Sequence, residues 1–167
     1  MQKLQILFIG IGGIGVSALA RYYLAKGWQV SGSDLFSSPI TENLQRESVR
    51  VFIGHKASQV AHGVERVVYS AAVKEDNVEL KEAKNFQLPI FSYAEALGDL
   101  TKQYITIAVA GAHGKSTTTA LLALMLIEAG LDPTVIVGTR LKEFGGTNFR
   151  LGKSRYLVIE ADEWNRS

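Results

Sequence analysis

One segment constrains the fold of this chain more than any other, the glycine-rich run Gly10-Ile11-Gly12-Gly13-Ile14-Gly15. The residues before it, 4–9, are apolar apart from Gln5, which predicts a strand buried on both faces of a parallel sheet. The residues after it, 14–26, carry apolar side chains at helical spacing and end before Gly27. A strand, a glycine loop and a helix in this order predict the start of a Rossmann-like α/β domain.

The alternation of strands and helices continues along the chain and then restarts. The patterns predict a short helix capped by Thr41, helices at 77–85 and 93–100, and strands at 29–33, 49–53, 66–70 and 89–91. The restart comprises a strand at 104–110, a helix at 115–129, and strands at 134–137 and 156–159 with a polar loop, 142–154, between them. We therefore expect one domain at 1–98 and the incomplete start of a second at 99–167.

Composition excludes several classes of protein. The chain is 47% hydrophobic, which is enough for a packed core, and its 18 basic and 16 acidic residues include no basic block typical of nucleic-acid binding. It has no cysteine, which excludes thiolate chemistry and agrees with a reducing compartment. The longest helical apolar run, 120–127, is far below the roughly 18 residues that span a membrane. We expect a cytoplasmic protein with no nucleic-acid or membrane partner.

The first glycine loop predicts a diphosphate site. Glycine allows a tight turn and close approach of the backbone, and the N–H groups and positive dipole end of the following helix stabilise anionic charge. Asp34 ends the next predicted strand, where dinucleotide-binding folds often carry an acidic residue that binds ribose, so the pattern alone favours NAD. A purely structural turn, with Asp34 capping a loop, remains open.

The second glycine loop is the stronger local signal. Gly114-Lys115-Ser116 lies between a predicted strand and helix and matches the core of a P-loop. Backbone N–H groups would hold phosphates, Lys115 would neutralise β/γ-phosphate charge, and Ser116 would offer its hydroxyl to Mg²⁺. Val109 stands where the general motif has glycine, so a generic ATPase is a poorer match. An unliganded lysine is disfavoured at the positive end of a helix.

An acidic segment, Glu160-Ala161-Asp162-Glu163, follows a strand that is expected beside the P-loop strand. Glu160 could therefore reach Mg²⁺ as an oxygen ligand. A solvated turn explains the same residues equally well. The fold class predicted is α/β: a Rossmann-like parallel-sheet domain followed by the truncated start of a P-loop ATPase domain.

The four motifs together resemble the Mur ligase family over the entire chain. They are the first glycine loop, Ser31-Gly32-Ser33-Asp34, Gly111-Ala112-His113-Gly114-Lys115-Ser116-Thr117 and the acidic segment. The resemblance implies an ATP- and Mg²⁺-dependent amide ligase of peptidoglycan precursor synthesis, and the first loop is most similar to ligases that join L-alanine to UDP-N-acetylmuramate through an acyl phosphate. It also implies that this loop binds the UDP-sugar diphosphate and not NAD.

The resemblance assigns roles to particular residues. It makes Lys115 catalytic and Ser116 and Glu160 the metal ligands. The segment 111–117 would bind ATP, including Ala112, which replaces the usual threonine, and His113. The UDP-sugar would be bound by Gly10, Gly12, Gly13, Ile14, Gly15, Asp34, His55, Ser70, Ala71, Ala72 and Asn148. From the residues alone, His55 and Asn148 could equally be turn residues, and 70–72 a plain strand end.

Two further expectations follow from the resemblance. The C-terminal domain of the family is absent, so this chain should have little or no ligase activity alone, and uncovered apolar surface should favour self-association. A murein-tripeptide recycling ligase and an NAD(P)-binding oxidoreductase are the alternatives.

Overall fold

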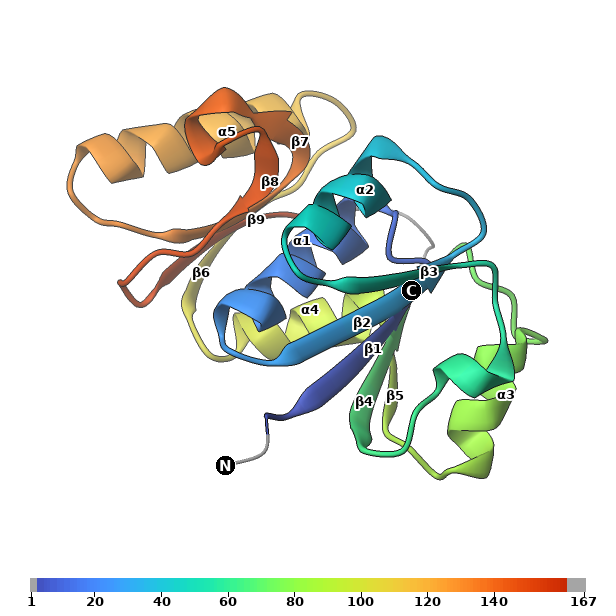
Figure 1. Ribbon diagram of the computed structural model, residues 1–167. Helices are drawn as coiled ribbons and strands as arrows, with labels where there is room; N and C mark the ends of the chain where they lie inside the picture. Colours follow the sequence, from blue (N-terminus) through green and yellow to red (C-terminus); the bar gives the residue numbers. More distant parts are fainter. Residues whose placement is uncertain (1–2, 162–167) are drawn as a thin grey trace. The chain divides into compact units, whose positions relative to one another are not determined.

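The computed structural model describes residues 3–161 and divides the chain into two compact units, one ending at Leu97 and the other beginning at Gly98. Both units are α/β, as predicted from the sequence (Figure 1). Within the described residues, no helix is sufficiently long and apolar to cross a membrane.

The first unit contains a five-stranded sheet in which every adjacent pair of strands is parallel. Its strand order is β3-β2-β1-β4-β5. The predicted strands are confirmed, with ends shifted by one or two residues. Their bounds are β1 (Gln5–Ile9), β2 (Gln29–Asp34), β3 (Arg50–Ile53), β4 (Val64–Tyr69) and β5 (Ile90–Ser92).

Helices cover both faces of this sheet (Figure 1). They are α1 (Ile14–Ala25), α2 (Pro39–Arg46), α3 (Val78–Asn85) and α4 (Tyr93–Thr101), with a short η1 (Ala57–Gln59) beside α3. The prediction that Thr41 caps α2 was wrong. Ser38 is the N-cap, and Thr41 completes a capping box three residues later. Pro39 explains the earlier start, because its fixed φ suits the first helical position.

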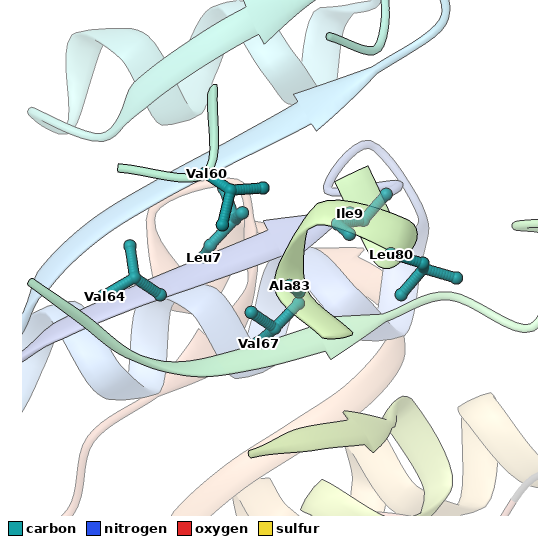
Figure 2. Close-up of a cluster of buried hydrophobic side chains, with 7 residues drawn as sticks. All are labelled: Leu7, Ile9, Val60, Val64, Val67, Leu80 and Ala83. Atoms are coloured by element: carbon teal, nitrogen blue, oxygen red, sulfur yellow. The ribbon is translucent and has the colours of Figure 1, made fainter. Parts of the chain in front are cut away.

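The two faces of β1 belong to different parts of the core. Leu7 and Ile9 pack with Leu80 and Ala83 of α3, together with Val60, Val64 and Val67 (Figure 2). On the opposite face, Phe8 lies 6.0 Å, ring centre to ring centre, from Tyr23 of α1. Burial of both faces explains why β1 is apolar from Ile6 to Ile9, up to the start of the first glycine loop.

The second unit contains a four-stranded sheet in the order β6-β9-β7-β8. Helix α5 packs against three of these strands through a core that includes Ala123, Val135 and Val158. The elements are β6 (Ile105–Val109), α5 (Lys115–Glu128), β7 (Thr134–Leu141), η2 (Lys142–Phe144), β8 (Thr147–Arg150) and β9 (Tyr156–Glu160).

The polar segment 142–154, predicted to be a loop, contains a strand. β8 pairs antiparallel with β7, which is itself four residues longer than predicted. Gly145 and Gly146 both have positive φ and allow the chain to turn back. A glycine pair between segments that alternate in polarity is a hairpin signal, and the short, polar β8 concealed it.

Candidate functional site

The first glycine loop lies at the carboxyl end of β1, between the ends of β2 and β4. The main-chain oxygen of Ser33 accepts hydrogen bonds from Gly10 N (2.8 Å) and Ile11 N (3.0 Å). Gly12 N donates to Asp34 Oδ2 at 2.8 Å. The first half of the loop is therefore fastened to the end of β2, at the point of the sheet where Rossmann-like folds bind ligands.

Three of the loop glycines are required by close packing. A Cβ on Gly10, where φ is +79°, would lie 2.8 Å from the Ser70 Cβ. On Gly12 it would lie 2.8 Å from Asp34 Oδ2, and on Gly15 2.6 Å from the ring of Tyr93. Sequence reasoning missed Tyr93 as a neighbour of the loop, because a tyrosine at a helix start carries no motif. The packing leaves no room for a side chain at these three positions.

The helix that follows the loop begins without a side-chain cap. The N-cap of α1 is Gly13, which has no side chain to cap the helix. Ser17 N donates a hydrogen bond to Gly13 O at 2.8 Å. The N–H groups of a first helical turn have no acceptor within the helix, and with the helix dipole they attract anions. This end of α1, rather than the bonded first half of the loop, is the part suited to a diphosphate.

Asp34 has a structural role in this chain. Its carboxylate accepts the hydrogen bond from Gly12 N and a long one, 3.5 Å, from Phe36 N. This matches the alternative in which the aspartate caps a loop. A further contact to ribose stays a prediction.

The other residues assigned to the UDP-sugar site occupy different environments. Ser70 directly follows β4 and packs against Gly10, whereas Ala71 and Ala72 are exposed. His55 is not a surface turn residue, because its side chain is only 14% exposed and Nδ1 lies 2.5 Å from Oε2 of Glu79. Asn148 lies on β8 of the second unit and is buried, so it does not form a turn.

Sequence reasoning missed Glu79, which has no exposed surface. Burial raises the pKa of this carboxyl, and hydrogen bonds from Ser33 and His55 partly oppose the shift. A glutamate in the first turn of a charged helix ordinarily indicates a favourable interaction with the helix dipole, so the burial of Glu79 could not be predicted from its position.

The second glycine loop follows β6 and leads into α5. Gly111 and Gly114 have φ of +148° and +74°. Gly114 is the N-cap of α5 and has no side chain to cap the helix. Lys115 Nζ donates to Gly111 O at 2.7 Å, so the ammonium group lies across the loop. Ala112, His113 and Thr117 are exposed. The loop presents backbone N–H groups and one cation to solvent, the arrangement that holds phosphates.

Glu160 reaches the start of α5, because β9 pairs with β6 as predicted. Its Oε1 accepts a hydrogen bond from Ser116 Oγ at 3.0 Å, and its Oε2 accepts one from Gly138 N at 2.8 Å. The adjacent Asp162 and Glu163 lie outside the described residues. Within residues 3–161, no three acidic, histidine or cysteine side chains gather as a metal cluster.

The fold and the two loops define a protein with two nucleotide-type α/β units, each with a glycine loop that leads into an uncapped helix. The model of the Mur ligase family, catalytic domain, matches residues 5–105. The chain belongs to the Mur ligase family, which confirms the resemblance seen in its motifs.

Among curated relatives, the chain is 50% identical over 156 residues to the UDP-N-acetylmuramate–L-alanine ligase of Solibacter usitatus, covering 93% of this chain and 33% of that protein. It is 48% identical over 156 residues to the enzyme of the same name from Aquifex aeolicus, covering 93% and 34%. The chain therefore spans about a third of the length of these relatives.

Solved structures agree with this relationship. The UDP-N-acetylmuramate–alanine ligase of Thermotoga maritima matches with a TM-score of 0.89 and 32% identity, covering 96% of this chain and 37% of that one. The UDP-N-acetylmuramate:L-alanyl-gamma-D-glutamyl-meso-diaminopimelate ligase of Neisseria meningitides matches with a TM-score of 0.88 and 30% identity, covering 98% and 54%.

Proposed function

We propose that this chain supplies the UDP-sugar and ATP sites of a ligase that joins L-alanine to UDP-N-acetylmuramate. The observation that carries the proposal is the pair of uncapped, glycine-led helix starts, at Gly13 and Gly114, the second with Lys115 across its loop. The backbone N–H groups at each of these helix starts can bind a chain of phosphate groups. Relatives at 44–51% identity bear the alanine ligase name, which supports L-alanine over a tripeptide as the second substrate.

The first unit would hold the UDP-sugar and the second would hold ATP. The muramoyl carboxylate would attack the γ-phosphorus of ATP, forming an acyl phosphate and releasing ADP. The amine of L-alanine would then attack the acyl carbon, and phosphate would leave as the amide forms. Lys115 would offset the negative charge on the transferred phosphoryl group, and the loop N–H groups would orient the phosphates.

Ser116 and Glu160 fit a magnesium site. Both offer hard oxygen donors, and their oxygens lie 3.0 Å apart. Adjacent ligands of an octahedral Mg²⁺ at about 2.1 Å are separated by about 3.0 Å. Bound Mg²⁺ would neutralise phosphate charge. Gly138 N fixes the other carboxylate oxygen, so the pair is held in place by β7 as well as by α5.

The UDP-sugar part of the proposal can be tested at the start of α1. Ile14 is the first residue of this helix and is 38% exposed. An Ile14→Asp variant puts negative charge where the diphosphate should lie, but the same charge is favourable to the free helix. Relative to an Ile14→Asn control, we expect Ile14→Asp to bind UDP-N-acetylmuramate at least about tenfold more weakly. The stability of the two variants should not differ in a way that the charge would explain. Equal binding by both variants would place the diphosphate elsewhere.

The ATP part can be tested with Lys115→Ala. Loss of a charge-assisted contact should weaken Mg-ATP binding by about 10- to 100-fold in calorimetry, whereas UDP-N-acetylmuramate binding should be unchanged. Lys102→Ala is the control, since the Lys102 side chain is 76% exposed and pairs with nearby Asp99. If Lys115→Ala and Lys102→Ala bound Mg-ATP alike, the second loop would not be the ATP site.

A further inference from the structure

A buried polar cluster lies next to the first glycine loop, formed by side chains from three separate elements. Ser33 Oγ, at the end of β2, donates to Glu79 Oε2 at 2.6 Å. His55 Nδ1, in the loop after β3, lies 2.5 Å from the same oxygen and 3.0 Å from Ser33 Oγ. Glu79 comes from the first turn of α3. The cluster therefore joins β2, the loop after β3 and α3 through one carboxylate oxygen.

This carboxylate is costly to bury. Glu79 is completely inaccessible to solvent, and its Oε1 is a buried oxygen for which the described residues supply no hydrogen-bond partner. An unsatisfied buried polar atom costs about 1–3 kcal/mol, and an apolar side chain of similar volume is often at least as stable in such a place. Packing alone therefore does not account for a glutamate at this position.

The cluster is connected to the first loop through Ser33. The main-chain oxygen of this residue holds Gly10 N and Ile11 N, while its side chain donates to Glu79. The next residue, Asp34, holds Gly12 N. The strand end that fastens the glycine loop is thus the same strand end that contacts Glu79 and His55.

The second ring nitrogen of His55 is turned away from this network. Nε2 makes no hydrogen bond within the described part of the chain, and the side chain retains 14% exposure. The Oε2–Nδ1 contact fixes the orientation of the imidazole ring. Nε2, on the other side of the ring, is then a hydrogen-bonding atom held in place without a partner from the described residues.

We propose that Glu79 is a positioning residue for the UDP-sugar site, which fixes the His55 ring through Nδ1 so that Nε2 forms a hydrogen bond with the UDP moiety. This inference rests on the proposed function, because it takes the first unit as the UDP-sugar site. Glu79 acts through His55 and does not itself touch the ligand.

A double-mutant cycle with Glu79→Met and His55→Ala tests this role. Methionine fills a similar volume, but it leaves Ser33 Oγ and His55 Nδ1 without their acceptor, so Glu79→Met should reduce stability moderately. It should also weaken binding of UDP-N-acetylmuramate by about tenfold. In the His55→Ala background, Glu79→Met should have no further effect on affinity. Glu65→Met is the matched control, because Glu65 is exposed and lies near the amino end of β4.

A spectroscopic readout accompanies the cycle. The chain has only three histidines, so the imidazole ¹⁵N signals of His55 can be assigned by difference from the His55→Ala spectrum. UDP-N-acetylmuramate should shift the Nε2 signal in the wild type and leave it nearly unshifted in Glu79→Met. If Glu79→Met does not fold, Glu79→Gln, which keeps the shape of the side chain, takes its place in the cycle and in the spectra.

The outcomes separate the two proposals. If the wild type binds UDP-N-acetylmuramate and the Glu79 variant binds equally well, the positioning role is overturned and the proposed function stands. Parallel losses of stability and affinity that persist in the His55→Ala background would also overturn it, since Glu79 would then be purely structural. No binding by the wild type would overturn both.

Discussion

The two glycine loops have the same position in their units but use glycine for different reasons. In the first loop, Gly10, Gly12 and Gly15 each have a side chain within 2.8 Å of the place where a Cβ would be. In the second loop, the residues of the described range 3–161 place nothing within 4 Å of that position at Gly114, and at Gly111 they place His113 O at 3.8 Å. The first loop is a packed turn whose early N–H groups are already bonded, whereas the second is open and holds its shape through positive φ.

The largest effect should come from alanine at matched glycines of the two loops. Gly10 and Gly114 have similar φ, +79° and +74°. Among the described residues, a Cβ on Gly10 would meet Ser70 at 2.8 Å and Val73 at 3.2 Å, whereas a Cβ on Gly114 would meet nothing within 4 Å. The left-handed conformation costs alanine about 1–2 kcal/mol, and crowding adds about 1–3 kcal/mol. We expect Gly10→Ala to destabilise the first unit by about 3 kcal/mol and Gly114→Ala the second by about 1 kcal/mol, measured by hydrogen exchange in peptides from each unit.

The double variant Gly10→Ala/Ser70→Gly checks the cause, because it removes the tighter of the two contacts, with Ser70 at 2.8 Å, and keeps the strained φ and the Val73 contact at 3.2 Å. It should recover part of the lost stability. Equal destabilisation by Gly10→Ala and Gly114→Ala would show that the tighter packing around Gly10 does not add to the cost of a side chain there.

A smaller difference should separate an ion pair in each unit. Arg21 of α1 binds Glu47, at the end of α2, through Nε (2.8 Å) and Nη2 (2.9 Å), and its side chain is only 7% exposed. The Lys102–Asp99 pair is 76% and 41% exposed. We expect Arg21→Met to lower the free energy of unfolding by about 2 kcal/mol, which is less than for a fully buried pair because Glu47 is 31% exposed. Lys102→Met should lower it by about 0–0.5 kcal/mol.

Urea unfolding of Arg21→Met, Glu47→Gln and the double variant would measure the coupling of the first pair. Additive losses would indicate that Arg21 contributes by packing and not through Glu47.

The smallest effect concerns the pH dependence of the second unit. A hydrogen bond from Arg150, and then one from Lys153 N, lower the pKa of Asp132 below its ordinary value. A lowered pKa in the folded state gives stability that is present above the ordinary pKa and is lost as the pH falls through the lowered one. Asp132→Asn should therefore lower the urea midpoint at about pH 7 and have less effect towards about pH 3.

Asparagine is a suitable control here because it tolerates the positive φ of this position, +43°, as aspartate does. A difference between Asp132→Asn and wild type that did not shrink in acid would mean that the charge of Asp132 is not what stabilises the loop.

The sequence predicted the elements whose patterns are local. Continuous apolar runs and glycine loops located β1, α1, β6 and α5 within about two residues, which is the usual uncertainty of helix and strand ends. The adjacency of β6 and β9, which brings Glu160 to Ser116, was also predictable, because strands of a parallel α/β unit follow restricted topologies.

The contacts that could not be predicted are those between residues far apart in the chain. Ser33, His55 and Glu79 meet only because the sheet order places β2 and β3 beside one another and α3 near their carboxyl ends. Tyr93 reaches Gly15 across a similar separation. Neither contact has a signature at a fixed spacing, so a single sequence shows polar and aromatic residues without showing their neighbours.

The most direct test of the central claim is calorimetric titration of this chain with UDP-N-acetylmuramate, and separately with NAD⁺, in the wild type and in Ile14→Asp. We expect UDP-N-acetylmuramate to bind with one site per chain, Ile14→Asp to weaken this binding, and NAD⁺ not to bind. Binding of NAD⁺ that is lost in Ile14→Asp, without binding of UDP-N-acetylmuramate, would contradict this expectation and make the first unit a dinucleotide site.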